Sequence, residues 1–215
     1  MFVSWLRFLS LTVASAWLAA GCSSGESLMP GFIVDDHGYV TAGPWHGWAW
    51  TETEEPNLGT TIAPMPPDKG GAGFFARNAG SPLCVSGTVA QDPNYAGIAV
   101  LGINIQQDKT PWGAPLNTWT PTGSGVNWQV ANTGGSPLRI AIQGPAGYPS
   151  QSWCYPITGS SGSVKWLDFA SQCWVGGNGT NYDESVPLNQ IIVEVPGLNT
   201  TAEPFNFCLE GVAPY

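Results

Sequence analysis

Short alternating segments, separated by turn residues, are the feature that most limits what this chain can fold into. Residues 126–131 alternate between apolar and mostly polar or small side chains, and residues 138–143 and 205–210 do the same. A period of two places one side of a β-strand in the core and the other side toward solvent. No stretch after residue 21 keeps apolar residues at the 3.6-residue spacing of a helix. The pattern therefore predicts an all-β domain.

The composition favours the same fold class. The chain has 28 Gly and 19 Pro to form turns, only 10% charged residues, and 11 Trp, which suits an extracytoplasmic β-domain better than a helical one. Gly- and Ser-rich turns at 132–135 and 159–162 are each expected to close a hairpin. Without a repeat or linker, we expect one β-domain over residues 32–215, either a sandwich or a barrel. Its strands are expected at 39–41, 47–53, 73–77, 83–90, 98–106, 126–131, 138–143, 152–157, 164–167, 190–195 and 205–211.

The first 21 residues have the layout of a cleaved export signal. Arg7 is the only charged residue among the first 25, an uncharged and mostly apolar run follows over 8–20, and small residues end the segment. This order is typical of a signal peptide. The apolar run is too short for a permanent membrane helix, which needs about 20 residues. We expect residues 1–21 to be removed.

The segment Leu18-Ala19-Ala20-Gly21-Cys22 resembles the lipobox of bacterial lipoproteins. The resemblance implies that Cys22 is acylated and becomes the N-terminus, that residues 22–31 form a polar tether, and that the protein is anchored in the envelope, at the outer membrane or cell surface. The alternative is ordinary secretion with Cys22 left as a free thiol. The odd number of cysteines favours lipidation, because an exposed thiol is reactive in an oxidising compartment.

The charge balance excludes some partners. The formal net charge is −9, and the six Lys and Arg residues are scattered. Nucleic-acid binding needs clustered basic residues that neutralise phosphates, so we expect no nucleic-acid partner. We also expect no electrostatic binding to anionic lipid.

Four cysteines remain when Cys22 is set apart, namely Cys84, Cys154, Cys173 and Cys208. An even number in an exported chain predicts two disulfides, for which three pairings are possible. A zinc site is disfavoured because no CxxC motif occurs and the two histidines are far from the cysteines in sequence.

The second half carries a series of short motifs, at residues 125–130, 138–140, 164–169, 189–195 and 205–212. Their order is similar to that of galactose-binding-like jelly rolls, family 11 carbohydrate-binding modules in particular. Residues 125–130 with Leu138-Arg139-Ile140 resemble their "G-V-x-F-x-V … L-R-I" pair, residues 164–169 their "W-x-x-F" strand, and residues 189–195 their "I-x-I-x-V" strand. Residues 205–212 resemble the closing strand, with Glu210-Gly211 in place of its "D-D". The resemblance spans about residues 95–213. It implies a jelly-roll sandwich and a carbohydrate ligand.

The resemblance also implies a disulfide pairing. In jelly rolls the first and last strands usually lie side by side, which predicts a Cys84–Cys208 bridge. Cys154 is then paired with Cys173, tying a strand to the long loop beside Trp174.

Carbohydrate is bound by aromatic rings that stack on its C–H faces and by planar polar groups that bind its hydroxyls. Polar candidates lie on the polar sides of the expected strands, and aromatic candidates lie near them in sequence. The set is Asn127, Gln129, Arg139, Gln143, Trp153, Tyr155, Trp174 and Asn206. The alternative is that Arg139 is an ordinary exposed residue and that Trp128 and Trp153 belong to the core.

The aromatic run 45–50 allows a further expectation. Trp48 and Trp50 share one face of a strand and are expected in the core, which leaves Trp45 and His46 in a loop.

The resemblance to sugar-binding jelly rolls also suggests one structural calcium ion where the chain ends meet, with Asp35, Asp36 and Glu210 as oxygen donors.

No catalytic motif is found, so no catalytic residue is assigned. The main hypothesis is a monomeric, non-catalytic lipoprotein that binds polysaccharide or glycoconjugate. One alternative is a jelly-roll glycoside hydrolase with two paired carboxylates; another is a structural envelope lipoprotein with a protein partner. Carboxylates available to a hydrolase are Glu52, Glu54, Glu55, Asp168, Glu184, Glu194 and Glu210.

Overall fold

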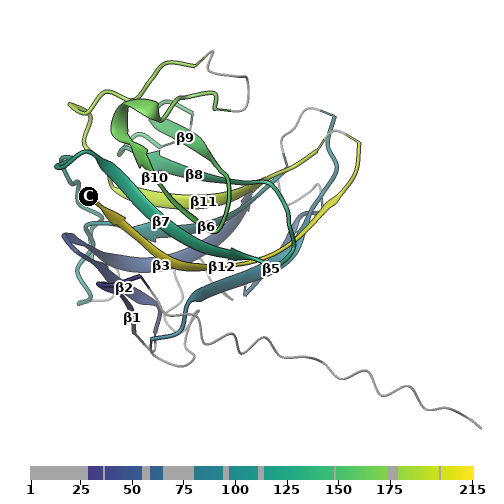
Figure 1. Cartoon of the computed structure of the whole chain (residues 1–215), viewed down its shortest axis with the longest axis horizontal. Helices are drawn as coiled ribbons and strands as arrows, with labels where there is room; N and C mark the ends of the chain where they lie inside the picture. Colours follow the sequence, from purple (N-terminus) through teal and green to yellow (C-terminus); the bar gives the residue numbers. More distant parts are fainter. Residues whose placement is uncertain are drawn as a thin grey trace, which may run out of the picture.

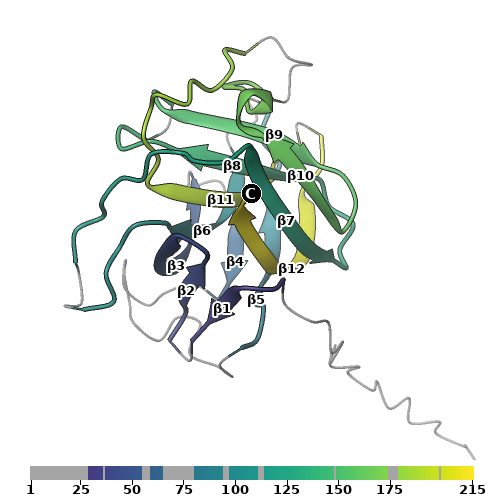
Figure 2. The same cartoon turned by 60° about the vertical axis from the view of Figure 1, so that its left-hand side comes forward.

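The computed structural model consists of two antiparallel β-sheets packed face to face (Figures 1 and 2). It describes residues 29–35, 37–54, 59–64, 80–93, 97–110, 114–147, 149–173, 179–198 and 200–215. Residues 1–28 lie outside this set, and with them the export signal, Cys22 and most of the tether. Within the described ranges no helix is long and apolar enough to cross a membrane.

One sheet has seven strands, in the order β1 (Phe32–Val34), β2 (Tyr39–Ala42), β3 (Trp45–Glu54), β6 (Ile98–Asn104), β11 (Gln190–Pro196), β8 (Leu138–Gln143) and β9 (Ser152–Ile157). The other sheet has five strands, in the order β10 (Ser161–Lys165), β7 (Gly125–Asn132), β12 (Glu203–Pro214), β5 (Leu83–Val89) and β4 (Thr61–Ala63).

The last eight strands pair as a folded ribbon. β5 pairs with β12, β6 with β11, β7 with β10, and β8 with β9, all antiparallel. This pairing of first with last and second with next-to-last is the winding of a jelly roll. β1 to β3 extend one sheet beyond β6, and β4 extends the other beyond β5. The all-β sandwich expected from the sequence is confirmed.

Alternation along the strands places one side of each sheet in a shared core. Four tryptophans and a tyrosine form a connected cluster inside it. Trp119 lies 5.5 Å from Trp45 and 5.8 Å from Trp166, and Tyr182 lies 6.3 Å from Trp166 and 4.9 Å from Trp153, measured between ring centroids. Such tilted and edge-on pairs each stabilise by about 0.5–1.5 kcal/mol beyond the burial of their area.

The expectation for the aromatic run 45–50 is wrong. β3 already begins at Trp45, which is 2% exposed and belongs to the core. Because alternate residues of a strand face opposite sides, Trp48 and Trp50 lie on the outer side of the sheet. His46 lies in β3 as well, not in a loop.

Both predicted disulfides are present. Cys84 and Cys208 are direct cross-strand partners in β5 and β12, so their bridge joins the first and last strands of the roll. The bridge from Cys154 to Cys173 joins β9 to the segment that follows Ala170. The two bridges belong to different sheets.

The two predicted hairpin turns connect different sheets instead. Residues 132–135 lead from β7 to β8, and residues 159–162 from β9 to β10, and in each case the two strands belong to opposite layers. A rolled ribbon requires such crossings, and local turn chemistry does not distinguish them from hairpins. Two three-residue strands, β1 and β4, were not expected. The strand expected at 164–167 ends at Lys165, where a 3₁₀ turn over Trp166–Asp168 begins. The strand expected at 73–77 lies outside the described residues.

Candidate functional site

The sequence-predicted site residues fall on two opposite outer surfaces of the sandwich. Asn127, Gln129 and Asn206 lie on the five-stranded sheet, in β7 and β12. Arg139 and Gln143 lie on the seven-stranded sheet, in β8. The core separates the two groups, so the predicted set does not form one site.

The aromatic members of that set do not complete a surface either. Trp153 is 9% exposed and packs in the core, as the alternative interpretation held, and Trp128 is buried there too. Tyr155 packs against the same core from β9. Trp174 lies outside the described residues.

The strands of the five-stranded sheet carry polar and small side chains on their outer side. The Gln129 side-chain amide donates to the buried Glu210 carboxylate at 3.0 Å. The outward positions of its described strands carry Ser, Thr, Asn, Gln, Glu, Cys, Lys, Ala and Pro, with no aromatic side chain among them. A sugar ring would find no stacking partner on these strands.

The outer side of the seven-stranded sheet is different, and we call its part on β3, β6, β11 and β8 the Trp50 face. Its central cross-strand row is apolar, with Trp50, Gly102, Ile192, Ala141 and Cys154 as successive partners. A methyl group added at Gly102 would stand only 2.2 Å from Cζ2 of Trp50. The indole of Trp50 therefore lies over the backbone of Gly102 on the outer side of the sheet. It is partly buried there, against a cluster of buried residues formed by Val100, Ala141, Cys154 and Ile192.

A polar row lies on one side of this apolar row. It consists of the cross-strand partners Asn104, Gln190, Gln143 and Ser152. Asn104 Oδ1 accepts hydrogen bonds from Trp50 Nε1 at 3.0 Å and from Gln190 Nε2 at 3.1 Å. Asn104 Nδ2 in turn donates to Gln107 Oε1. The side-chain amides of Asn104, Gln107 and Gln190 and the indole of Trp50 are thus joined in one hydrogen-bonded group.

Besides Trp50, a pair of aromatic residues borders the Trp50 face on the side of β2. Tyr39 and Trp48 are cross-strand partners, and their rings meet edge-on at 5.2 Å. The Tyr39 hydroxyl donates to the Gln107 carbonyl at 2.9 Å, and the Lys109 ammonium lies 5.7 Å from the centre of the Tyr39 ring. These contacts fix the Tyr39 ring where the polar row begins.

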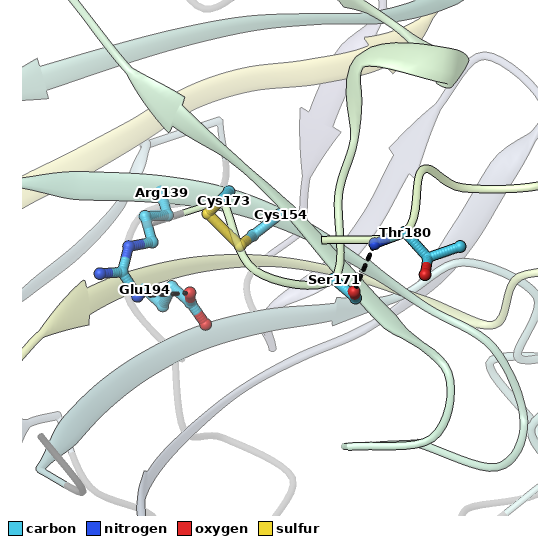
Figure 3. Close-up of a disulfide and its surroundings, with 6 residues drawn as sticks. All are labelled: Arg139, Cys154, Ser171, Cys173, Thr180 and Glu194. Atoms are coloured by element: carbon cyan, nitrogen blue, oxygen red, sulfur yellow. Dashed lines mark hydrogen bonds and ion pairs between the residues drawn. A yellow bond between two sulfur atoms is a disulfide. The ribbon is translucent and has the colours of Figure 1, made fainter. Parts of the chain in front are cut away.

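The row on the other side of the Trp50 face carries charge. Glu52, Val100, Glu194 and Arg139 are successive cross-strand partners there. Arg139 Nη1 lies 3.7 Å from Glu194 Oε1, with both side chains largely buried (Figure 3). Burial lowers the pKa of the Arg139 guanidinium and Glu194 opposes that change, but an arginine remains charged at neutral pH. The pair offers planar polar groups with little net charge.

The Cys154–Cys173 disulfide lies beside this charged row. Cys154 pairs with Ala141, two residues along β8 from Arg139, and packs against Val100 and Ile192. The segment that carries Cys173 is held by Ser171, whose hydroxyl accepts the Thr180 N–H at 3.0 Å (Figure 3). The disulfide therefore fixes the border of the Trp50 face at β9.

Asp35 and Glu210, two of the three candidate calcium ligands, have other partners. Asp35 forms an ion pair with Lys109 and accepts the N–H groups of His37 and Tyr39. Burial alone would raise the pKa of Asp35, but these contacts outweigh it and lower that pKa. Asp36 lies outside the described residues. Among the described residues there is no group of three His, Cys, Asp or Glu side chains that could hold a metal. Calcium binding stays an untested prediction.

Sequence reasoning missed Trp48, Trp50, Asn104 and Gln190 as parts of a site, and it considered Glu194 only as a carboxylate available to a hydrolase. A signal was available in the sequence, because a polar residue ends one mostly apolar strand, at Asn104, and another begins a second such strand, at Gln190. A polar residue on the outer side of a central strand needs a partner or a ligand.

No protein-family model matches the chain, and no curated protein matches it. Among solved structures the chain is similar to the family 11 carbohydrate-binding module of the cellulosomal cellulase Lic26A-Cel5E of Clostridium thermocellum. The two are 15% identical with a TM-score of 0.39, over 85% of this chain and 95% of that chain. The candidate site is therefore defined by the residues of the Trp50 face alone.

Proposed function

We propose that the Trp50 face binds carbohydrate without catalysis, and that the protein presents it from an envelope membrane through a lipid on Cys22. The observation that carries the proposal is the half-buried indole of Trp50, which lies over Gly102 on the outer side of the sheet. The cross-strand row that it begins is flanked by a row of amides on one side and by the row of the arginine–carboxylate pair on the other. Sugars are bound by this combination, with stacking on C–H faces and bidentate hydrogen bonds to hydroxyls.

The charges favour a neutral ligand. Arg139 is paired with Glu194, Glu52 lies in the same row, and the chain carries a net charge of −9. An acidic polysaccharide would meet repulsion and no unpaired cation in this row. Neutral polysaccharide is therefore the expected class.

The direct test is depletion of the purified full chain from solution by insoluble neutral polysaccharides, with glucans, xylans, mannans and chitin in parallel. At least one of them should deplete the wild-type chain. Trp50→Ala should abolish the depletion, whereas Asn206→Ala on the opposite sheet should leave it unchanged. Absence of depletion by every polysaccharide and of any signal on a glycan array would overturn the proposal in favour of a protein partner.

A glycoside hydrolase remains the second candidate because Glu52 and Glu194 share one row, separated by the single strand β6. Two strand spacings place their backbones about 10 Å apart, near the upper limit of about 9.5 Å between the carboxyl groups of inverting hydrolases. Release of reducing ends from a bound polysaccharide, lost in Glu52→Gln, would favour this candidate. Binding without release favours the proposal.

A further inference from the structure

The hydrogen-bonded group around Asn104 has a direction that its two ends determine. The Trp50 indole N–H can only donate, and the Ala114 carbonyl, which accepts from Gln107 Nε2 at 2.8 Å, can only accept. Between these ends Asn104 must turn Oδ1 toward Trp50 and Nδ2 toward Gln107. Gln107 must then turn Oε1 toward Asn104. The orientation of both amides thus follows from the chemistry of the ends.

The same direction reaches Gln190 on the neighbouring strand. Because Asn104 Oδ1 is an acceptor, Gln190 must donate to it through Nε2, as it does at 3.1 Å. The Gln190 carbonyl oxygen, Oε1, is then turned away from Asn104, on the half-buried outer side of β11. Oε1 is therefore the acceptor of Gln190 that does not face Asn104.

We infer that Asn104 is the positioning residue of the Trp50 face, and that it orients two groups toward a ligand. It holds the half-buried Trp50 indole over Gly102, where a ligand would stack on the part of the ring that stays exposed. It also sets Gln190 so that Oε1 accepts a hydroxyl proton from the ligand. The ligand class that this arrangement selects is a polyol with an apolar ring face and a hydroxyl donor near its edge.

This inference rests on the proposed function for the identity of the ligand, but not for the positioning itself. The two parts have separate measurements. The position of the Trp50 indole is read from its ¹H–¹⁵N resonance, which is assigned by its disappearance in Trp50→Phe. Ligand binding is read from depletion by the polysaccharide that retains the wild-type chain.

The test compares Asn104→Leu with Asn127→Leu, the same change at a half-buried Asn on the opposite sheet. Asn104→Leu should move the Trp50 indole resonance upfield through loss of the acceptor, and weaken binding about tenfold, the effect of one lost hydrogen bond. Asn127→Leu should change neither. Asn104→Asp retains the acceptor toward Trp50, so it should keep the indole resonance downfield and show that the fold is intact.

Each other outcome is decisive. An unchanged indole resonance in Asn104→Leu would overturn the positioning role, whatever binding does. A shifted resonance with unchanged binding would overturn the ligand-directed part of the inference. If the wild-type chain binds no polysaccharide, the proposed function and the ligand-directed part fail together, while the resonance still decides the positioning.

Discussion

Arg139 and Glu194 face each other across β8 and β11 on the outer side of the seven-stranded sheet, with side chains only 20% and 13% exposed. Outer strand positions are normally solvated, so this degree of burial shows that neighbouring groups cover the pair. Its charges are neutralised locally while the guanidinium and carboxylate stay at the border of the Trp50 face. The pair therefore places planar polar groups at the border of the Trp50 face, and each charge depends on the other for its burial.

Replacing one partner of this ion pair should lower the free energy of unfolding more than replacing both partners. Arg139→Met or Glu194→Leu alone leaves one largely buried charge without its partner, and we expect a loss of about 2 kcal/mol in the free energy of unfolding. The double variant should recover most of the loss, because two apolar side chains then replace both charges. Urea denaturation of the four proteins measures the difference. Additive losses in the double variant would show that the two side chains do not interact.

Gly102→Ala tests whether the Trp50 indole lies on the sheet. The added methyl group would stand 2.2 Å from the ring, so the indole must move. We expect a change in near-ultraviolet circular dichroism and a loss of polysaccharide binding. In a Trp50→Ala background the same methyl group meets no ring, and its effect on the spectrum should vanish. An equal spectral change in both backgrounds would contradict the geometry.

The two disulfides should differ in their effect on binding. Closing loops of 124 and 19 residues is expected to stabilise the fold by about 5 and about 3 kcal/mol respectively. Cys84→Ala/Cys208→Ala should therefore lower the melting temperature more. Cys154→Ala/Cys173→Ala should weaken binding more, because only that bridge borders the Trp50 face. Calorimetry measures the melting temperature of each variant. Depletion by polysaccharide, at a temperature where all variants are folded, measures binding. Equal binding by the two double variants would show that the ligand binds away from the Trp50 face.

The proposed tether is tested at Cys22. In a bacterial host, Cys22→Ala should shift the full chain from the membrane fraction to the soluble exported fraction, and intact-mass analysis should show loss of the acyl groups. The matched control is Ser23→Ala, which leaves the cysteine in place. A wild-type chain of unmodified mass that is already in the soluble fraction would contradict lipidation.

The sequence identified the strands well because alternation is a local property. The strands expected at 138–143 and 152–157 have the observed bounds, and the disulfide pairing implied by the jelly-roll resemblance is correct. Which side of the sandwich an alternating row faces is not determined locally, because it depends on the sheet that the strand joins. β7 and β8 follow each other in sequence, yet the roll sends them to opposite sheets, so Gln129 and Arg139 face opposite directions.

The aromatic run 45–50 shows the same limit. Its alternation defines two faces, but both carry tryptophan, so hydrophobicity alone does not select the inner one. Pairing with β6 decides it, because Ala49 faces the core beside Ile103 while Trp50 covers Gly102. Glycine at position 102 provides the space for an indole on the outer surface. That relation joins residues 52 positions apart and cannot be read from either segment alone.

The most direct test of the account is a ¹H–¹⁵N titration of the full chain with a soluble oligosaccharide of the polysaccharide that it binds. The indole resonances of Trp48 and Trp50 and the side-chain amide of Gln190 should shift and saturate together. The side-chain amides of Asn127 and Asn206, on the opposite sheet, should not move. Saturable shifts at Asn127 and Asn206, with Trp50 and Gln190 unchanged, would contradict the assignment of the binding site to the Trp50 face.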